Sequence, residues 1–182
     1  MLIRAAQLAD MTAVARVNVD SWRTTYRGIV PDDYLANRSY DERAAVFGKS
    51  LTQEGVIFFV AEDEADGIVG FASAGPERTG NPEFRGELYA VYLLDHHQRH
   101  GIGADLVARV AESLRAAGFN SMLVWVLATN PACRFYERLG GTRIRTQTIT
   151  IGGVSLEEVA YGWRGLAPLL LADRAGRRHY RA

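Results

Sequence analysis

Two apolar strands joined by a single helix constrain the fold of this chain more than any other feature. The runs ELYAVYLL at residues 87–94 and SMLVWVLA at 121–128 predict strands, and the second is apolar enough for burial on both faces. The helix between them has one apolar face, made of Ile102, Leu106, Val107, Val110 and Leu114. The order strand, helix, strand predicts a parallel pair with a right-handed crossover.

The other segments predict antiparallel strands and further helices around this pair. Strands are expected at 2–7, in a hairpin at 56–64 and 67–75, and in a closing hairpin at 142–151 and 157–165. Helices are expected at 10–26, with Asp10 as N-cap, and at 31–39, 40–53 and 130–140. No repeat or linker interrupts the chain, so we expect an α/β fold with one domain over residues 1–170. A basic tail follows at 171–182, with Arg174, Arg177, Arg178 and Arg181 as a solvated end.

Composition limits the partners of the chain. Its 182 residues carry 21 basic and 21 acidic side chains, so no global field attracts nucleic acid or an anionic membrane. No apolar run reaches the roughly 20 residues that a membrane span needs. Cys133 is the single cysteine, which excludes an internal disulfide and indicates a reducing compartment. We therefore expect a cytoplasmic protein with a small-molecule partner.

The start of the central helix has no side chain to cap it. Gly101 and Gly103 stand there instead, and bare backbone amides at a helix start attract phosphate groups. A glycine turn that only bends the chain is the alternative interpretation. The Rossmann pattern fails because Leu106 stands where its third glycine belongs, and the P-loop fails because Lys49 lacks the earlier glycine.

The pattern Q-x-x-G-x-G, formed by Gln98, Gly101 and Gly103, resembles the acetyl-CoA pyrophosphate loop of the GNAT superfamily of N-acetyltransferases. The order of the expected elements and the segment NPACRFYERLGG at 130–141 are also similar to that family. The segment VNVDSWRTTYRGIVPDDYL at 17–35 resembles a bacterial branch of uncharacterised members. The resemblance implies a mixed, mostly antiparallel sheet of about seven strands flanked by helices, in which the fourth and fifth strands are parallel and splay apart.

By this resemblance, acetyl-CoA is the cosubstrate. The backbone amides of residues 99–104 would bind its pyrophosphate, the strand before the loop would hold the pantetheine arm, and the Val91 amide would meet the oxyanion. The implied cofactor-binding residues are Val91, Tyr92, Leu93, Gln98, Arg99, His100, Gly101, Ile102, Gly103, Ala104 and Asn130.

Acetyl transfer to an amine needs a base for the amine and an acid for the leaving thiolate. Glu87 stands where several family members place a general base, and apolar neighbours could raise its pKa towards neutrality. Tyr136 stands where the family's tyrosine reaches the coenzyme sulfur. A solvated strand-edge glutamate and a core aromatic ring are the alternative interpretations of these two residues.

Four aromatic residues are candidates for an acceptor pocket by apolar or cation–π contact: Trp22, Tyr26, Tyr34 and Phe84. The histidines at 96, 97 and 100 have only Asp95 beside them in the sequence, so we expect a polar turn and no metal. Cys133 has no adjacent histidine and is expected to be an inert thiol.

The sequence therefore predicts transfer of an acetyl group from acetyl-CoA to a primary amine of a small molecule or peptide, by direct attack in a ternary complex. A non-catalytic acyl-CoA-binding regulator and a transferase of a longer acyl group remain the alternatives. A homodimer is a further hypothesis, based on the closing hairpin and the tail.

Overall fold

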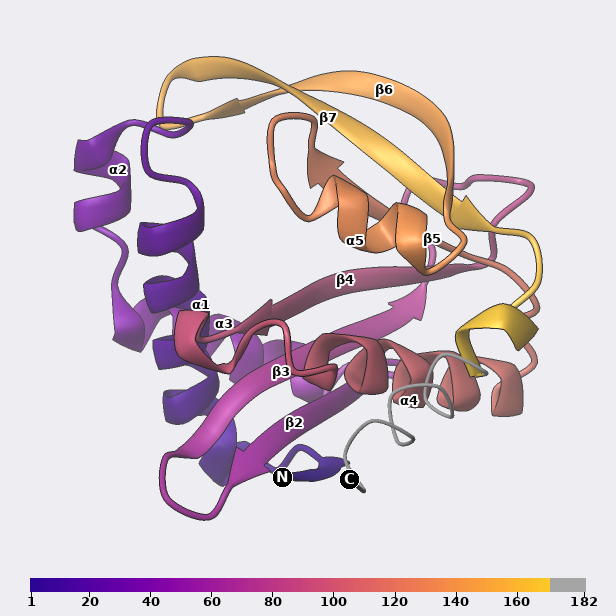
Figure 1. Cartoon of the computed structure of the whole chain (residues 1–182), viewed down its shortest axis with the longest axis horizontal. Coiled ribbons are helices and arrows are strands. Elements are labelled where there is room, and N and C mark those ends of the chain that lie inside the picture. Colours follow the sequence, from indigo (N-terminus) through magenta and orange to yellow (C-terminus); the bar gives the residue numbers. More distant parts are fainter. Residues whose placement is uncertain (171–182) are drawn as a thin grey trace.

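The structure is a computed structural model that describes residues 1–170; the predicted basic tail lies outside the described residues. Figure 1 shows a central sheet with helices packed against it. The strands are β1 (Leu2–Ala5), β2 (Ile57–Asp63), β3 (Gly67–Pro76), β4 (Gly86–Leu93), β5 (Met122–Leu127), β6 (Thr142–Ile151) and β7 (Val154–Trp163). The helices are η1 (Leu8–Asp10), α1 (Met11–Thr25), α2 (Asp32–Ala36), α3 (Tyr40–Leu51), η2 (Asp95–His97), α4 (Ile102–Ala116) and α5 (Cys133–Arg138).

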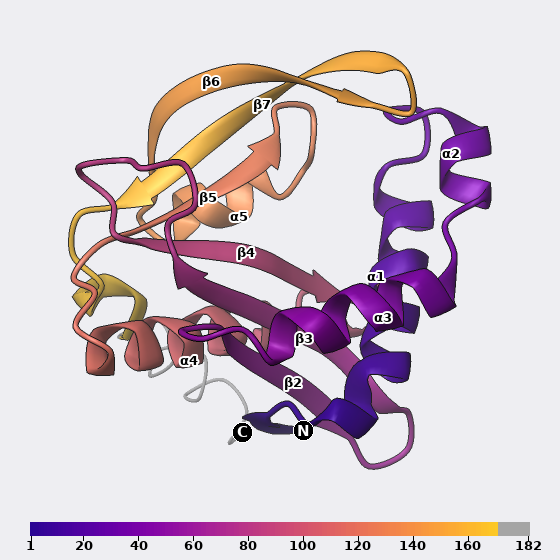
Figure 2. The ribbon, with the colours of Figure 1, turned by 180° about the vertical axis from the view of Figure 1, so that it is seen from behind.

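The seven strands form one sheet in the order β1-β2-β3-β4-β5-β7-β6. Every neighbouring pair is antiparallel except β4 and β5, which are parallel and joined through α4. This confirms the mixed, mostly antiparallel sheet of seven strands that the sequence predicts. Helix α4 covers one face of β2–β4, whereas α1 and α3 lie on the opposite face (Figures 1 and 2).

The core forms where the apolar patterns of the sequence meet. The predicted apolar face of α4 is buried against β2, β3 and β4, with Leu106, Val107 and Val110 fully enclosed. On the other face, Val14 and Val17 of α1 belong to the same apolar cluster. No helix among residues 1–170 is long and apolar enough to span a bilayer.

Asp10 does not cap α1 as the sequence indicated. It occupies the N-cap position, but its side chain makes no capping hydrogen bond to that helix. Its carboxylate instead accepts from the Arg4 Nη1 and the Gln7 backbone N–H, both at 2.7 Å. The Arg4 guanidinium thereby holds the pKa of Asp10 below its usual value. The acidic side chain therefore ties β1 to the short η1 turn.

The parallel pair β4–β5 is joined over a very short distance. Gly86 pairs with Met122 and Glu87 with Leu123, and the two strands then separate. In the part of the chain that the structure describes, Leu88 and residues 90–93 of β4 pair with β3 alone. The strands thus splay as the family resemblance implies, and the β5-facing edge of β4 lies open.

Strand β4 also carries an irregularity just past this branch point. Ala74 of β3 pairs with Leu88 and Ser73 pairs with Ala90, so Tyr89 has no partner in the ladder. An extra residue of this kind bends a strand and changes where its side chains point. The bulge at Tyr89 lies between the branch point and the open edge of β4.

Candidate active site

A cleft of about 990 Å³ opens where β4 and β5 separate. Most of the predicted cofactor-binding residues line it: Val91, Tyr92, Leu93, Gln98, Arg99, Gly101, Gly103, Ala104 and Asn130. Two predicted residues do not. Ile102 is 7% exposed and packs in the core, and the His100 side chain is exposed outside the cleft. Any contribution of these two positions to the cleft must come from their backbone.

The loop at the start of α4 presents a row of free amides. Among residues 1–170, the N–H groups of residues 99–103 donate no backbone hydrogen bond. Ala104 differs from the prediction, because its amide already donates to the Gly101 carbonyl at 2.9 Å. Unsatisfied donors at the positive end of a 15-residue helix form an anion-binding site. The free backbone amides of residues 99–103 therefore fit a pyrophosphate group.

The fold requires glycine at only one of the two glycine positions of the loop. Gly101 adopts φ +85°, a left-handed conformation that side chains disfavour. Gly103 has no such constraint, and a Cβ there would meet Leu93 Cδ1 at 3.4 Å and Phe135 Cζ at 3.5 Å, which are ordinary contacts. The fold alone would thus accept alanine at 103, so the absence of a side chain there leaves room in the cleft.

Gln98 connects the loop to the end of β4. Its Nε2 donates to the Leu93 carbonyl at 3.2 Å, and Ser21 Oγ donates to the same oxygen at 3.0 Å. The Leu93 carbonyl oxygen therefore already accepts two hydrogen bonds. Main-chain contacts with a ligand must use residues of β4 before Leu93. The Gln98 side chain therefore fixes the loop to the end of β4.

Asn130 fixes the opposite wall of the cleft. The residue is 7% exposed; its Oδ1 accepts from the Ala132 amide at 2.8 Å and its Nδ2 donates to Tyr26 Oη at 3.1 Å. The first bond sets the entry to α5, and the second ties that helix to α1. Tyr26 accordingly lines this cleft and not the acceptor cavity for which it was predicted.

Tyr136 on α5 lies where either interpretation of its role would place it, in the core and at the cleft. Its ring is 5% exposed and packs near Tyr161 and Trp163, with centroids 6.1 and 6.3 Å away. It also lines the cleft, and its hydroxyl has no hydrogen-bond partner among the described residues. Burial raises the pKa of this hydroxyl well above its ordinary value of about 10. Tyr136 therefore keeps its proton and can offer it to a group in the cleft.

Glu87 is neither solvated nor free. Its side chain is 2% exposed and lines neither cavity. Its carboxylate accepts from three donors of Arg78: the backbone N–H at 3.1 Å, Nε at 3.0 Å and Nη2. The Arg78 guanidinium lies 4.2 Å from the ring centroid of Tyr89, the bulged residue of β4. Glu87 is thus positioned to hold Arg78, which the sequence did not indicate as a site residue.

A second cavity of about 560 Å³ lies between α1, α3 and β4. It contains Trp22 and Tyr34, two of the predicted acceptor residues. Its wall also includes Tyr89, Ala90 and Tyr92, which line the first cleft as well. The two cavities therefore share the bulged part of β4 as a common wall.

Phe84 does not belong to this second cavity. It is fully buried, and a Cβ built on Gly162 of β7 would come within 2.5 Å of its ring. Its position at the closed end of the β4–β5 pair, and not at the open end, separates it from both cavities. The prediction that Phe84 contacts an acceptor is therefore not retained.

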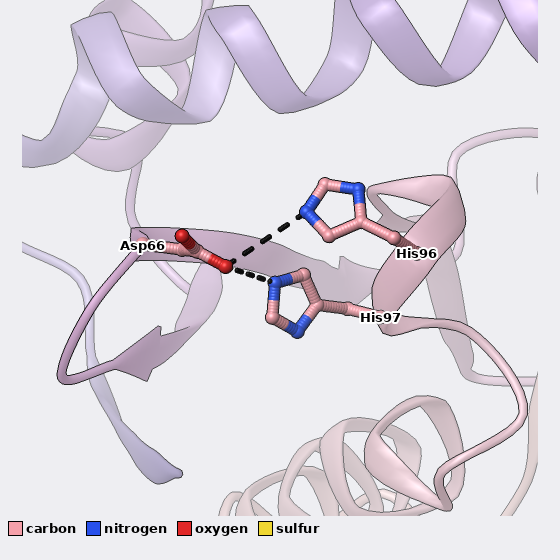
Figure 3. Close-up of side chains that lie close together, drawn as sticks. All are labelled: Asp66, His96 and His97. Atoms are coloured by element: carbon pink, nitrogen blue, oxygen red, sulfur yellow. Dashed lines mark hydrogen bonds and ion pairs between the residues drawn. The ribbon is translucent and has the colours of Figure 1, made fainter.

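The histidine turn has an acidic neighbour, Asp66, that the sequence did not indicate. Figure 3 shows His96 and His97 of η2 facing Asp66 from the β2–β3 turn. The Nε2 of His97 lies 2.9 Å from Asp66 Oδ2, and that of His96 lies 3.9 Å away. This contact ties the β2–β3 turn to the segment that leads into the glycine loop. Cys133 lies on α5, and burial raises the pKa of its thiol.

Comparison with known proteins agrees with this geometry. The FR47-like protein family matches residues 77–150, the segment that holds the bulge, the loop and α5. An uncharacterized N-acetyltransferase of Bacillus subtilis, YuaI, is 46% identical over 167 residues, which cover 92% of this chain and 95% of that protein. This chain belongs to the GNAT superfamily of N-acetyltransferases.

Solved GNAT structures share the fold. A ribosomal-protein-alanine N-acetyltransferase from Brucella melitensis superposes with a TM-score of 0.71 at 25% identity, over 90% of this chain and 99% of that one. An acetyltransferase from Salmonella typhimurium, solved with acetyl-CoA, gives 0.69 at 22% identity, over 91% and 94%. The N-acetyltransferase relatives, which cover most of the chain, identify it as an acetyl-CoA-dependent acyltransferase, and the solved structures show its fold.

Proposed function

We propose that this GNAT protein transfers the acetyl group of acetyl-CoA to a primary amine of a small molecule or peptide, by direct attack within a ternary complex. The observation that supports it is that the two cavities share Tyr89, Ala90 and Tyr92 of β4 as a common wall. A cofactor held in the cleft and an amine held in the second cavity would meet there without an intermediate on the enzyme. Proximity of this kind supplies much of the rate enhancement of group transfer.

The cleft would hold the cofactor through backbone groups. The amides of residues 99–103 face the pyrophosphate, and the open edge of β4 around Val91 accepts the pantetheine arm as an added strand. The Val91 amide is the proposed oxyanion donor. Neither these contacts nor the proposed proton transfers need a metal ion.

Tyr136 is the proposed donor to the leaving sulfur. Because its proton is held firmly, the hydroxyl stabilises the developing thiolate by hydrogen bonding even before the proton is transferred. For Glu87 the geometry favours a role other than the general base that we expected, because its carboxylate already accepts three hydrogen bonds. We propose that Glu87 fixes Arg78 on the cavity wall and that the amine loses its proton to water.

The decisive experiment follows thiol release from acetyl-CoA with a broad panel of amines, with mass spectrometry of the products. We expect thiol release that depends on the amine, and a product heavier than that amine by one acetyl group in place of one hydrogen. Binding of coenzyme A without release for any amine would favour the non-catalytic regulator. Faster transfer from longer acyl-CoA esters would favour the other alternative.

Two further properties belong to this proposal. The free thiol of Cys133 is consistent with a cytoplasmic setting, where thiols stay reduced. Strand β6 forms one edge of the sheet, and its mostly exposed residues are available for pairing with a second copy. Light scattering should then give about twice the chain mass of 20.1 kDa; the single mass would contradict the dimer.

A further inference from the structure

Two guanidinium groups on the wall of the second cavity have no acidic partner. Arg38 lies 3.8 Å from the ring centroid of Trp22, and its Nη2 donates to Asn18 Oδ1 at 2.9 Å. Arg43 lies 4.8 Å from the ring centroid of Phe47. Among residues 1–170, no carboxylate lies within 4.0 Å of either guanidinium, and the buried Nε of each has no hydrogen-bond partner.

This arrangement is costly without a counter-ion. Burial, and then the charge of Arg43, lower the pKa of Arg38 below its ordinary range. Buried charges in proteins are normally paired, because removing an unpaired ion from water costs several kcal/mol. Here two like charges stay together beside an open cavity, with only neutral and aromatic neighbours. Both arginines are half-buried, and an anion that enters the cavity would supply the partner that the protein does not.

The acidic residues of the cavity do not supply that partner. Glu77 accepts from the backbone amides of Thr79 and Asn81, at 2.9 and 2.7 Å. Glu54 is exposed and makes no ion pair with either arginine. The third arginine of the cavity, Arg78, is already neutralised by Glu87. Only Arg38 and Arg43 thus carry charge that the surrounding protein leaves unbalanced.

We propose that Arg38 and Arg43 form an oxyanion subsite that binds a carboxylate or phosphate group of the amine acceptor. The subsite is connected directly to the reaction point: Arg38 stacks on Trp22, and Trp22 Nε1 donates to Tyr92 Oη at 2.9 Å. Tyr92 lines both cavities. A small molecule with an amine and an oxyanion separated by a short spacer can therefore reach both places.

This inference rests on the proposed acetyl transfer and makes it more specific. A guanidinium binds carboxylate or phosphate through paired N–H donors, which gives both affinity and orientation. An uncharged amine would leave the two arginines unpaired, so it should be the poorer substrate. The lysine side chain of a peptide carries no oxyanion on a short spacer from its amine. It should be a poor substrate for the same reason.

The first test compares amines that differ only in the anionic group. Suitable pairs are γ-aminobutyrate with butylamine, phosphoethanolamine with ethanolamine, and L-phenylalanine with phenethylamine. In at least one pair we expect the anionic amine to have a kcat/KM about 10- to 100-fold higher, the range for hydrogen bonds to charged groups. Arg38→Gln and Arg43→Gln should each reduce this ratio towards 1.

Arg27→Gln is the matched control. Arg27 is an exposed arginine just past α1 that lines neither cavity, so its removal changes the net charge by the same amount without touching the subsite. Its selectivity ratio should equal that of the unmodified protein. Equal ratios in all four proteins, or no preference for any anionic amine, would overturn the subsite.

A binding measurement separates failure of the subsite from failure of acetyl transfer. Inorganic phosphate is titrated into the full chain saturated with coenzyme A, which blocks the glycine loop, and the affinity is followed by calorimetry. Phosphate should bind the unmodified protein and Arg27→Gln at least 10-fold more tightly than Arg38→Gln or Arg43→Gln. If no amine reacts but this pattern is found, the subsite stands and the proposed transfer fails. Equal phosphate affinity in all four proteins refutes the subsite whatever the enzyme does.

Discussion

Replacing Gly103 by alanine tests the assignment of the glycine loop with little risk to the fold. The new methyl group would make ordinary contacts with Leu93 and Phe135, and the backbone at 103 needs no left-handed conformation. Alanine within a helix stabilises it by about 0.5–1 kcal/mol relative to glycine. We therefore expect Gly103→Ala to unfold at the same temperature as the unmodified protein, or slightly higher.

Cofactor binding should respond in the opposite direction. The methyl group would stand in the cleft beside the free amides of residues 99–103 and keep the pyrophosphate from approaching them. Loss of one such charge-assisted hydrogen bond costs about 1.5–3 kcal/mol, which corresponds to roughly 10- to 100-fold in affinity. Isothermal titration with coenzyme A measures this change directly, and thermal unfolding of the free protein measures stability.

Gly48→Ala is a suitable control, because it makes a similar change away from the site. Gly48 lies within α3, and a Cβ there would meet Leu8 Cδ1 at 3.4 Å, the distance found at Gly103. This variant should gain the same helix stability and bind coenzyme A normally. A folded Gly103→Ala protein with unchanged affinity would show that the loop does not cradle the pyrophosphate.

Three further substitutions test the roles of single side chains. Tyr136→Phe should leave the affinity for coenzyme A unchanged and reduce turnover by at least about 10-fold, since a general acid contributes about 10²–10⁴-fold; full turnover would make Tyr136 purely structural. Because burial raises the pKa of Tyr136, the pH–rate profile of the unmodified enzyme should show no alkaline decline from this group below about pH 10. Glu87→Gln should keep the acidic limb of that profile while raising KM through the misplaced Arg78, and loss of the limb would restore Glu87 as the base. Asn130→Ala should cost about 1–3 kcal/mol of stability, because it leaves the Ala132 amide without its partner and removes the hydrogen bond to the Tyr26 hydroxyl; an unchanged melting temperature would contradict this.

The sequence predicted the fold well because its strongest signals are local. The apolar face of α4 and the unbroken apolar run of β5 each depend on residues that are neighbours in one element. The glycine loop was predicted for the same reason, since Gly101 and Gly103 are informative by themselves. The family resemblance then supplied the splay of β4 from β5, which no single segment encodes.

The parts of the site that the sequence did not predict depend on contacts between distant segments. Arg78 meets Glu87 only because the loop before β4 folds back, and Tyr89 bulges only through its register with β3. Asp66 meets the histidine turn across 31 positions of sequence. Arg38 shows no local pattern at all, because its lack of a counter-ion becomes visible only when every neighbour is in place.

The aromatic predictions show the same limit. Trp22 and Tyr34 line the second cavity, whereas Phe84 lies in the core and Tyr26 lines the other cleft. An aromatic residue near the end of an element has the same local signature whichever way its ring points. Its direction is decided by space, such as the room that Gly162 leaves for the ring of Phe84.

Because only two positions pair β4 with β5, a substrate bound along β4 would also stabilise the sheet. A pantetheine arm hydrogen-bonded along β4 would replace the pairing that is missing between β4 and β5 beyond these two positions. A molecule that is consumed at every turnover would then also stabilise the sheet. Ligand that binds only the native state adds about 2.7 kcal/mol at a hundred times its dissociation constant. The supply of acetyl-CoA would then govern how long each copy survives proteolysis, and the amount of enzyme in a cell would follow its metabolic state.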